Sequence, residues 1–108
     1  MPMSLEVYAD RSGKSRWRLR SPNGQIVASA GAAFANRSNA KRAAKAFQAN
    51  AVKSSFEIYA DRKGKHRWRA VSRNGQIVAS GGEAFESQSS AKRAATNVQK
   101  KVCDAKLD

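Results

Sequence analysis

The stretch YADRKGKHRWR, residues 59–69, decides the fold because it occurs twice. Its other copy is YADRSGKSRWR at residues 8–18, an offset of 51 positions. The same offset holds further along the chain, relating NGQIVAS at residues 23–29 to 74–80 and AKRAA at residues 40–44 to 91–95. A unit of about fifty residues has therefore been duplicated. Any function must be compatible with two copies of it.

The length indicates one domain, residues 1–108, made of two repeats at 5–52 and 56–103. Each repeat alone is small for an independent core, so we expect the two to pack against each other as a pseudo-two-fold pair within one chain. Two separately folded domains on a linker are disfavoured because the connection, residues 48–55, is short. We expect a monomer with an internal pseudo-dimer, and further association stays open.

Each repeat predicts a three-stranded antiparallel meander. Residues 5–10 and 56–61 alternate with a period of two, which is typical of a half-buried strand. An Asp-x-x-Gly turn follows in both copies, and Asn-Gly further on predicts a type I′ hairpin turn. These turns bound second strands at residues 15–21 and 66–72 and third strands at residues 25–30 and 76–81.

A helix completes each repeat. Ser38 and Ser89 are candidate N-caps, and the first helix is expected over residues 39–50. Apolar side chains recur at helical spacing, as Ala40, Ala43, Ala44 and Phe47 in one copy and Ala91, Ala94, Ala95, Val98 and Val102 in the other. The predicted fold is therefore α+β, with tandem βββα repeats.

The pattern Glu-aliphatic-Tyr-x-Asp-x-x-Gly-x-x-Arg-Trp-Arg, then Asn-Gly-Gln-Ile-Val-Ala-Ser and Ser-x-x-Ala-x-Arg-Ala, resembles the YegP-like family of small bacterial and archaeal proteins. The resemblance covers nearly the whole chain, twice. It implies three-stranded antiparallel units that each carry a helix. It also implies that single-repeat members dimerise, whereas tandem members build the pair within one chain. It implies no particular activity.

The charge is strongly positive, with 21 Lys+Arg against 8 Asp+Glu and a formal net charge of +13. Both halves contribute, because residues 1–52 hold nine basic and two acidic side chains (+7) and residues 53–108 hold twelve and six (+6). A basic excess in both repeats belongs to the folded unit and attracts polyanions such as nucleic acid, acidic proteins or anionic lipid surfaces.

The sequence offers no catalytic, metal or cofactor site. His66 is the only histidine, and we see no His/Cys/carboxylate cluster and no phosphate-cradling glycine loop. Asp10 and Asp61 are explained by the turns that they begin. The single Cys103 is expected to be a buried thiol. With no signal peptide and no membrane-spanning stretch recognised, we expect a cytoplasmic protein that is not an enzyme.

Two surfaces are candidates for binding. The first is the sheet face, where alternation places Tyr8, Arg16, Arg18, Tyr59, Arg67 and Arg69 opposite the Trp side. Tyrosines flanked by arginines are suited to stacking bases and holding phosphates. Alternatively, the arginines pair with Glu6 and Glu57 and the tyrosines pack on arginine stems or in the seam between repeats. Trp17 and Trp68 are expected in the core.

The second surface is the pair of helix faces, with Lys41, Arg42, Lys45, Lys92, Arg93 and Lys100. No acidic residue balances them within either helix, so they repel one another and phosphate would relieve that repulsion. This favours non-enzymatic nucleic-acid binding of low sequence specificity. The alternative is a module that recognises an acidic protein or a larger assembly.

Overall fold

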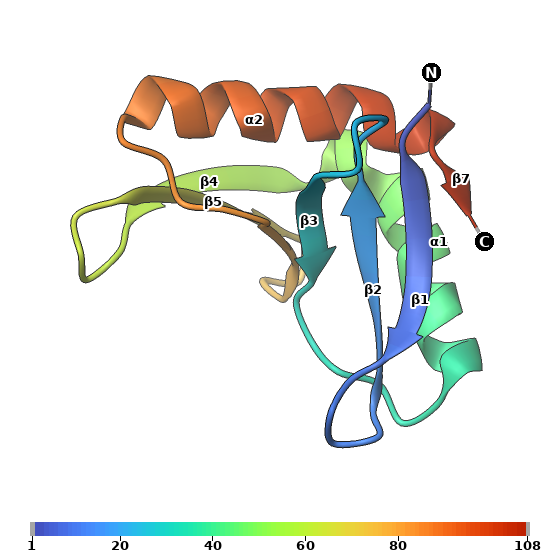
Figure 1. Cartoon of the computed structure of the whole chain (residues 1–108). Coiled ribbons are helices and arrows are strands. Elements are labelled where there is room, and N and C mark those ends of the chain that lie inside the picture. The colour runs from blue at the N-terminus through green and yellow to red at the C-terminus, as the bar shows by residue number, and fades with distance from the viewer. Residues whose placement is uncertain (1, 108) are drawn as a thin grey trace.

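The computed structural model describes residues 2–107, and it consists of one curved, mostly antiparallel sheet with both long helices on the same face (Figure 1). The first repeat contributes β1 Ser4–Ala9, β2 Ser15–Arg20, β3 Ile26–Ala30, α1 Arg37–Asn50 and the 3₁₀ turn η1 Ala51–Lys53. The second contributes β4 Ser55–Ala60, β5 His66–Val71, β6 Ile77–Gly81, α2 Gln88–Lys101, η2 Val102–Asp104 and the short β7 Lys106–Leu107. The predicted tandem βββα fold is confirmed.

The two meanders join edge to edge into a seven-stranded sheet of order β4-β5-β6-β3-β2-β1-β7. At the seam β3 pairs antiparallel with β6, with Ser29 opposite Ser80. These two serines are equivalent positions of the repeats, so the pseudo-two-fold axis passes between them. Gly31 N donates to Val78 O at 3.2 Å and Gly82 N donates to Val27 O at 3.1 Å, which are symmetric bonds at the two ends of the seam.

The predicted type I′ turn is wrong. Gly24 has a φ of 88°, but no residue other than glycine has a positive φ among those described, so Asn23 cannot adopt the first position of that turn. Instead Gly24 N donates to Ser21 O at 2.9 Å, and Asn23 Oδ1 accepts from Gln25 N at 3.1 Å. Pro22 at the second position of a type I turn, followed by a left-handed glycine, gives this longer loop.

Both helices begin two residues earlier than predicted. The N-cap of α1 is Asn36, whose Oδ1 accepts from Asn39 N at 2.8 Å, and that of α2 is Ser87, whose Oγ accepts from Ser90 N at 3.1 Å. Ser38 and Ser89 lie inside the first turn. In each repeat, two polar residues with one residue between them are suited to the N-cap position. The backbone is extended at the earlier of the two, Asn36 or Ser87, so that residue is the N-cap.

One core serves both repeats. Trp17 and Trp68 are each 1% exposed, as predicted, and lie in the same apolar cluster. Aromatic rings connect them across the pseudo-two-fold axis: Trp17 stacks on Phe47 at 5.1 Å, Phe47 lies 6.3 Å from Phe56, and Phe56 stacks on Trp68 at 5.5 Å. The repeats therefore pack as one body.

The ends of the two helices are connected by a reciprocal exchange of hydrogen bonds. Gln48 Nε2 donates to the carbonyl oxygens of Val102 and Ala105 at 3.0 and 2.9 Å. The equivalent Gln99 Nε2 donates to Ala51 O at 3.1 Å and to Ser54 O at 3.4 Å. Each glutamine satisfies the carbonyls that follow the other repeat's helix.

Candidate nucleic-acid interface

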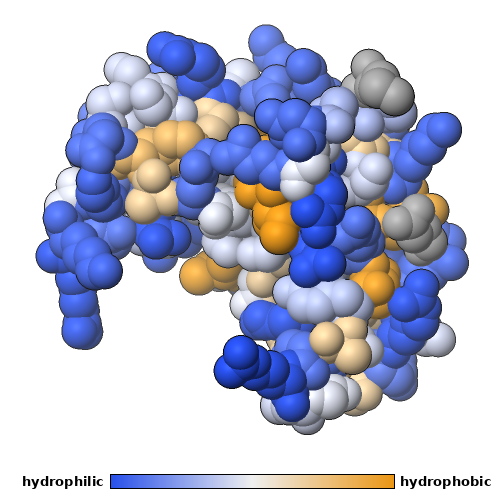
Figure 2. Space-filling view, viewed as in Figure 1, coloured by the Kyte–Doolittle hydropathy of each residue, from blue (hydrophilic) through white to orange (hydrophobic). Residues whose placement is uncertain are grey.

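The predicted candidates lie on two separate surfaces. Tyr8, Tyr59 and the four arginines of the Arg-Trp-Arg stretches are on β1, β2, β4 and β5, on the face of the sheet that no helix covers. This face is concave, and Figure 2 shows the hollow between the two halves of the molecule. The basic residues of α1 and α2 lie on the other side. The structure does not bring the two sets together.

Strand register builds one row of polar side chains across the whole uncovered face. In order across the sheet the row is Glu57, Arg69, Ser80, Ser29, Arg18 and Glu6. The row reads the same from both edges, as the pseudo-two-fold axis requires. Each arginine thus stands between a serine and a glutamate.

The glutamates neutralise arginines of this face. Arg18 Nε lies 2.7 Å from Glu6 Oε1, and Arg69 Nε lies 2.9 Å from Glu57 Oε1. Arg20 Nε also reaches Glu6 Oε2 at 3.3 Å. The bonds from Arg18, and next those from Arg20, lower the pKa of the Glu6 carboxyl below its ordinary value of 4.5.

Arg16 and Arg67 pair with the turn aspartates, so the predicted pairing of these two with Glu6 and Glu57 is wrong. Arg67 Nε lies 2.9 Å from Asp61 Oδ2, whereas Arg16 Nε is 3.8 Å from Asp10 Oδ2. The first bond is the largest cause of the lowered pKa of Asp61. For Asp10 the largest cause of the lowered pKa is instead the Ser12 hydroxyl, which donates at 2.8 Å.

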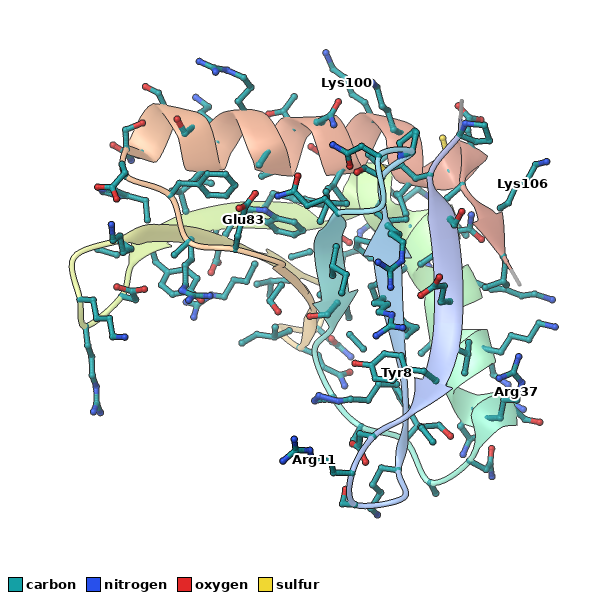
Figure 3. All side chains as sticks on the ribbon, in the orientation of Figure 1. Tyr8, Arg11, Arg37, Glu83, Lys100 and Lys106 are labelled. Atoms are coloured by element: carbon teal, nitrogen blue, oxygen red, sulfur yellow. The ribbon has the colours of Figure 1, made fainter. Side chains whose placement is uncertain are left out.

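The two tyrosine rings are covered by arginine. The Arg18 guanidinium lies over the Tyr8 ring at 4.4 Å from its centroid, and Arg69 lies over Tyr59 at 4.8 Å. Both are cation–π contacts in which one ring face is already occupied. In Figure 3 Tyr8 projects on the uncovered side of the sheet. The alternative prediction for this face is therefore observed for the tyrosines, which pack against arginine, and for the pairing of Arg18 and Arg69 with Glu6 and Glu57.

The basic side chains on the helix faces differ from the sheet arginines in their ion pairing. The six predicted side chains are all exposed, and within residues 2–107 none forms an ion pair: Lys41, Arg42, Lys45, Lys92, Arg93 and Lys100. Neither helix contains an acidic residue. Lys100 points away from the sheet in Figure 3. The carboxylates on β1, on β4 and in the first turn of each repeat neutralise sheet arginines, which leaves the helix charge uncompensated.

The helices carry two further basic residues that the sequence analysis did not include among the candidates. Arg37 is in the first turn of α1, four positions before Lys41, and Lys101 ends α2. Arg37 was not predicted to be helical, because the helix was expected to begin at residue 39. Its exposed guanidinium donates through Nη1 to Val7 O at 3.2 Å.

The prediction of a buried thiol is wrong. Cys103 is exposed in η2, where its Sγ lies 3.7 Å from Lys100 O. Its equivalent Val52 is 76% exposed in η1. Both line a shallow hollow where the ends of α1 and α2 meet, together with Gln48 and Gln99. The 3₁₀ turns point these two side chains outward and bury Ala51 and Val102 instead.

The fold defines a tandem-repeat protein in which two βββα units share a sheet and a core. The family model described as "Domain of unknown function (DUF1508)" matches residues 10–55 and 61–108, one match in each repeat. The chain therefore belongs to this family of uncharacterised YegP-like proteins.

Two solved structures are similar over 100% of this chain. One is a UPF0339 protein from Shewanella oneidensis, with a TM-score of 0.82, 14% identity and 91% of its own chain covered. The other is the protein of unknown function yegP from E. coli, with a TM-score of 0.82, 14% identity and 92% covered. At this identity they show the fold alone. No curated protein matches the chain. No helix within residues 2–107 is long and apolar enough to cross a membrane.

Proposed function

We propose that this protein binds nucleic acid, without catalysis and with little sequence preference, through the outer faces of α1 and α2. One observation carries the proposal. Every sheet arginine predicted to bind has a carboxylate partner, whereas the six basic side chains predicted on the helices are exposed and have none within residues 2–107. Among the residues predicted to bind, the basic groups left without a carboxylate partner are thus those on the helices.

The helix charge is closely spaced and costs self-repulsion. Lys41, Arg42 and Lys45 lie within about one turn of α1, and Lys92 and Arg93 repeat the first two positions in α2. Like charges four positions apart, as Lys41 and Lys45 are, destabilise a helix by roughly 0.2–0.5 kcal/mol per pair. Phosphate groups would convert this repulsion into attraction and release counterions.

The geometry favours contact with the phosphate backbone over contact with bases. Base stacking needs an open aromatic face, but Tyr8 and Tyr59 are covered by Arg18 and Arg69. The outer helix faces carry basic and small polar side chains and no aromatic residue. A duplex presents phosphates without requiring stacking, so we expect double-stranded nucleic acid to bind at least as tightly as single strands.

A salt titration tests the proposal. If about six to eight phosphates are engaged, affinity for a labelled 20-base-pair duplex should fall on the order of a thousand-fold between 50 and 200 mM salt. Replacing Lys41, Arg42, Lys92 and Arg93 with alanine should lower the slope of log affinity against log salt by about 3 to 4. Affinity that is independent of salt contradicts the proposal.

A matched control separates the site from the net charge. Arg11, Lys14, Arg62 and Lys63 are exposed at the hairpin turns and unpaired among the described residues, so alanine there also removes four charges. The helix variant should lose most of the binding and the turn variant little of it. Equal losses would mean that the helix faces are not the site. Loss of binding in Tyr8→Ala and Tyr59→Ala with the helix variant unchanged would assign it to the sheet instead.

A further inference from the structure

The two edges of the sheet are not equivalent. β7 covers the start of β1 in parallel, with Ser4 opposite Lys106 and Leu5 opposite Leu107. Further along β1, Arg37 Nη1 donates to Val7 O at 3.2 Å. β4 is the pseudo-symmetric counterpart of β1, yet within residues 2–107 its only neighbouring strand is β5. The chain passes from η1 directly into β4, so in the described part of the chain no segment covers β4 as β7 covers β1.

The register identifies the uncovered backbone groups of β4. Asp61 N donates to Lys65 O at 2.8 Å, which places the alternate residues Tyr59 and Glu57 on the β5 side. Phe56, Ile58 and Ala60 therefore direct their N–H and C=O groups outward. In α2 the position equivalent to Arg37 is Gln88, and among the described residues no hydrogen bond reaches Ile58 O, the counterpart of Val7 O. Such an edge is a template for a further strand.

The apolar side chains beside this edge are less covered than those beside the β1 edge. Phe56 and Ile58 are only half-buried, whereas their counterparts Leu5 and Val7 are 0% and 9% exposed. Leu107 lies against the core beside Leu5, and within residues 2–107 no side chain takes the equivalent place at the β4 edge. An aliphatic residue of an added strand would occupy that place.

Positive charge surrounds the same edge. Gln99 Nε2 donates to Ser54 O, which places one flank of α2 beside the start of β4. Lys92 lies seven residues earlier on that flank. Lys53 precedes β4, and Arg62 and Lys63 follow it, all exposed. A second copy of this chain, with a net charge of +13, would be repelled here.

We propose that the β4 edge binds an extended acidic segment of a partner protein by β-strand addition. Its backbone pairs with Phe56, Ile58 and Ala60, an aliphatic side chain packs beside the half-buried Phe56, and its carboxylates meet Lys92 and the basic residues at both ends of β4. The site shares only Lys92 with the outer helix faces, and its backbone pairing does not depend on the nucleic-acid proposal.

The test uses the full chain labelled with ¹⁵N and an acetylated, amidated octapeptide of alternating Glu and Leu. Amide shifts and exchange protection should appear at Phe56, Ile58 and Ala60, with none at Leu5. Ala60→Pro removes an outward N–H without breaking the β4–β5 ladder and should weaken binding about three- to tenfold. Ala60→Ser is the matched control and should bind normally.

A second variant leaves the strand unchanged. Gln88→Arg restores the side chain that caps Val7 O in the first repeat and should block the edge, while retaining the duplex binding proposed above. A peptide of the same composition with Glu and Leu in two blocks should bind weakly. Equal affinity for the alternating and the block peptide would mean that binding is only charge attraction, and it would overturn the proposal. Equal affinity of wild type, Ala60→Pro and Gln88→Arg for the alternating peptide would overturn it as well. So would shifts confined to the helix faces.

Discussion

Replacing Gly82 with alanine should open the seam between the repeats. A Cβ at Gly82 would lie 2.2 Å from Ile26 O and 2.9 Å from Ile26 C, whereas ordinary contact begins at 3.4 Å. Both obstructing atoms belong to the backbone, so one strand must move by more than about 1 Å. The bond from Gly82 N to Val27 O at 3.1 Å lies at the same point and would be lost.

The expected destabilisation combines two effects. Overpacking costs about 1–3 kcal/mol and a lost backbone hydrogen bond about 1 kcal/mol, so the free energy of unfolding should fall by about 2–4 kcal/mol. That is a large part of the roughly 5–15 kcal/mol that stabilises a domain. Urea denaturation followed by the fluorescence of the buried Trp17 and Trp68 measures it, with an unchanged m-value showing that cooperativity persists.

The symmetric substitution provides an internal check. A Cβ at Gly31 would lie 2.3 Å from Ile77 O, so Gly31→Ala should cost a similar amount. Both changes strain one seam, and their combined effect should fall short of the sum by at least about 0.5 kcal/mol. Gly13→Ala is the control, because its Cβ meets nothing within 4 Å and its cost of about 1–2 kcal/mol comes only from a φ of 81°. A loss below about 0.5 kcal/mol for Gly82→Ala would refute the close-approach argument.

Other predictions concern the core, the helix ends and pH. Phe47→Ala should destabilise by about 3–5 kcal/mol in the same assay, because the ring is 3% exposed and joins the two halves of the aromatic chain. Gln48→Ala removes the side-chain donor to the carbonyls of Val102 and Ala105, of which Val102 O keeps its bond from Ala105 N, and should cost about 1–3 kcal/mol, with faster amide exchange in β7. Because the pKa of Glu6 is lowered on folding, its contribution is present above the ordinary value of 4.5 and is lost as pH falls through the lowered value. Glu6→Gln should therefore flatten the decline in stability between about pH 5 and pH 3, and an unchanged decline would contradict the assignment.

Local patterns were sufficient for the three strands and the long helix of each repeat. The alternation at Leu5 and Val7, the glycines of the first turns and the apolar stripe through Ala44 and Phe47 each reflect residues a few positions apart. The duplication then implied that two such units share one core. Sequence also identified the basic helix residues as exposed, since charge on the side opposite an apolar stripe faces water.

Tertiary structure decided what depends on pairing between distant residues. Nothing local indicates that β3 would join β6, that Glu6 would select Arg18 and Arg20 over Arg16, or that β7 would cover β1 while β4 stays open. The strand pairing and the ion pairs depend on strand register, and the position of β7 depends on which sheet edge the chain reaches after α2. Cys103 is a further example, because it is exposed in a 3₁₀ turn that buries Val102 instead, and Gln48 of the other repeat hydrogen-bonds to that turn. Periodicity reports which side of an element is apolar, whereas only the assembled sheet determines which charges meet a partner and which remain free.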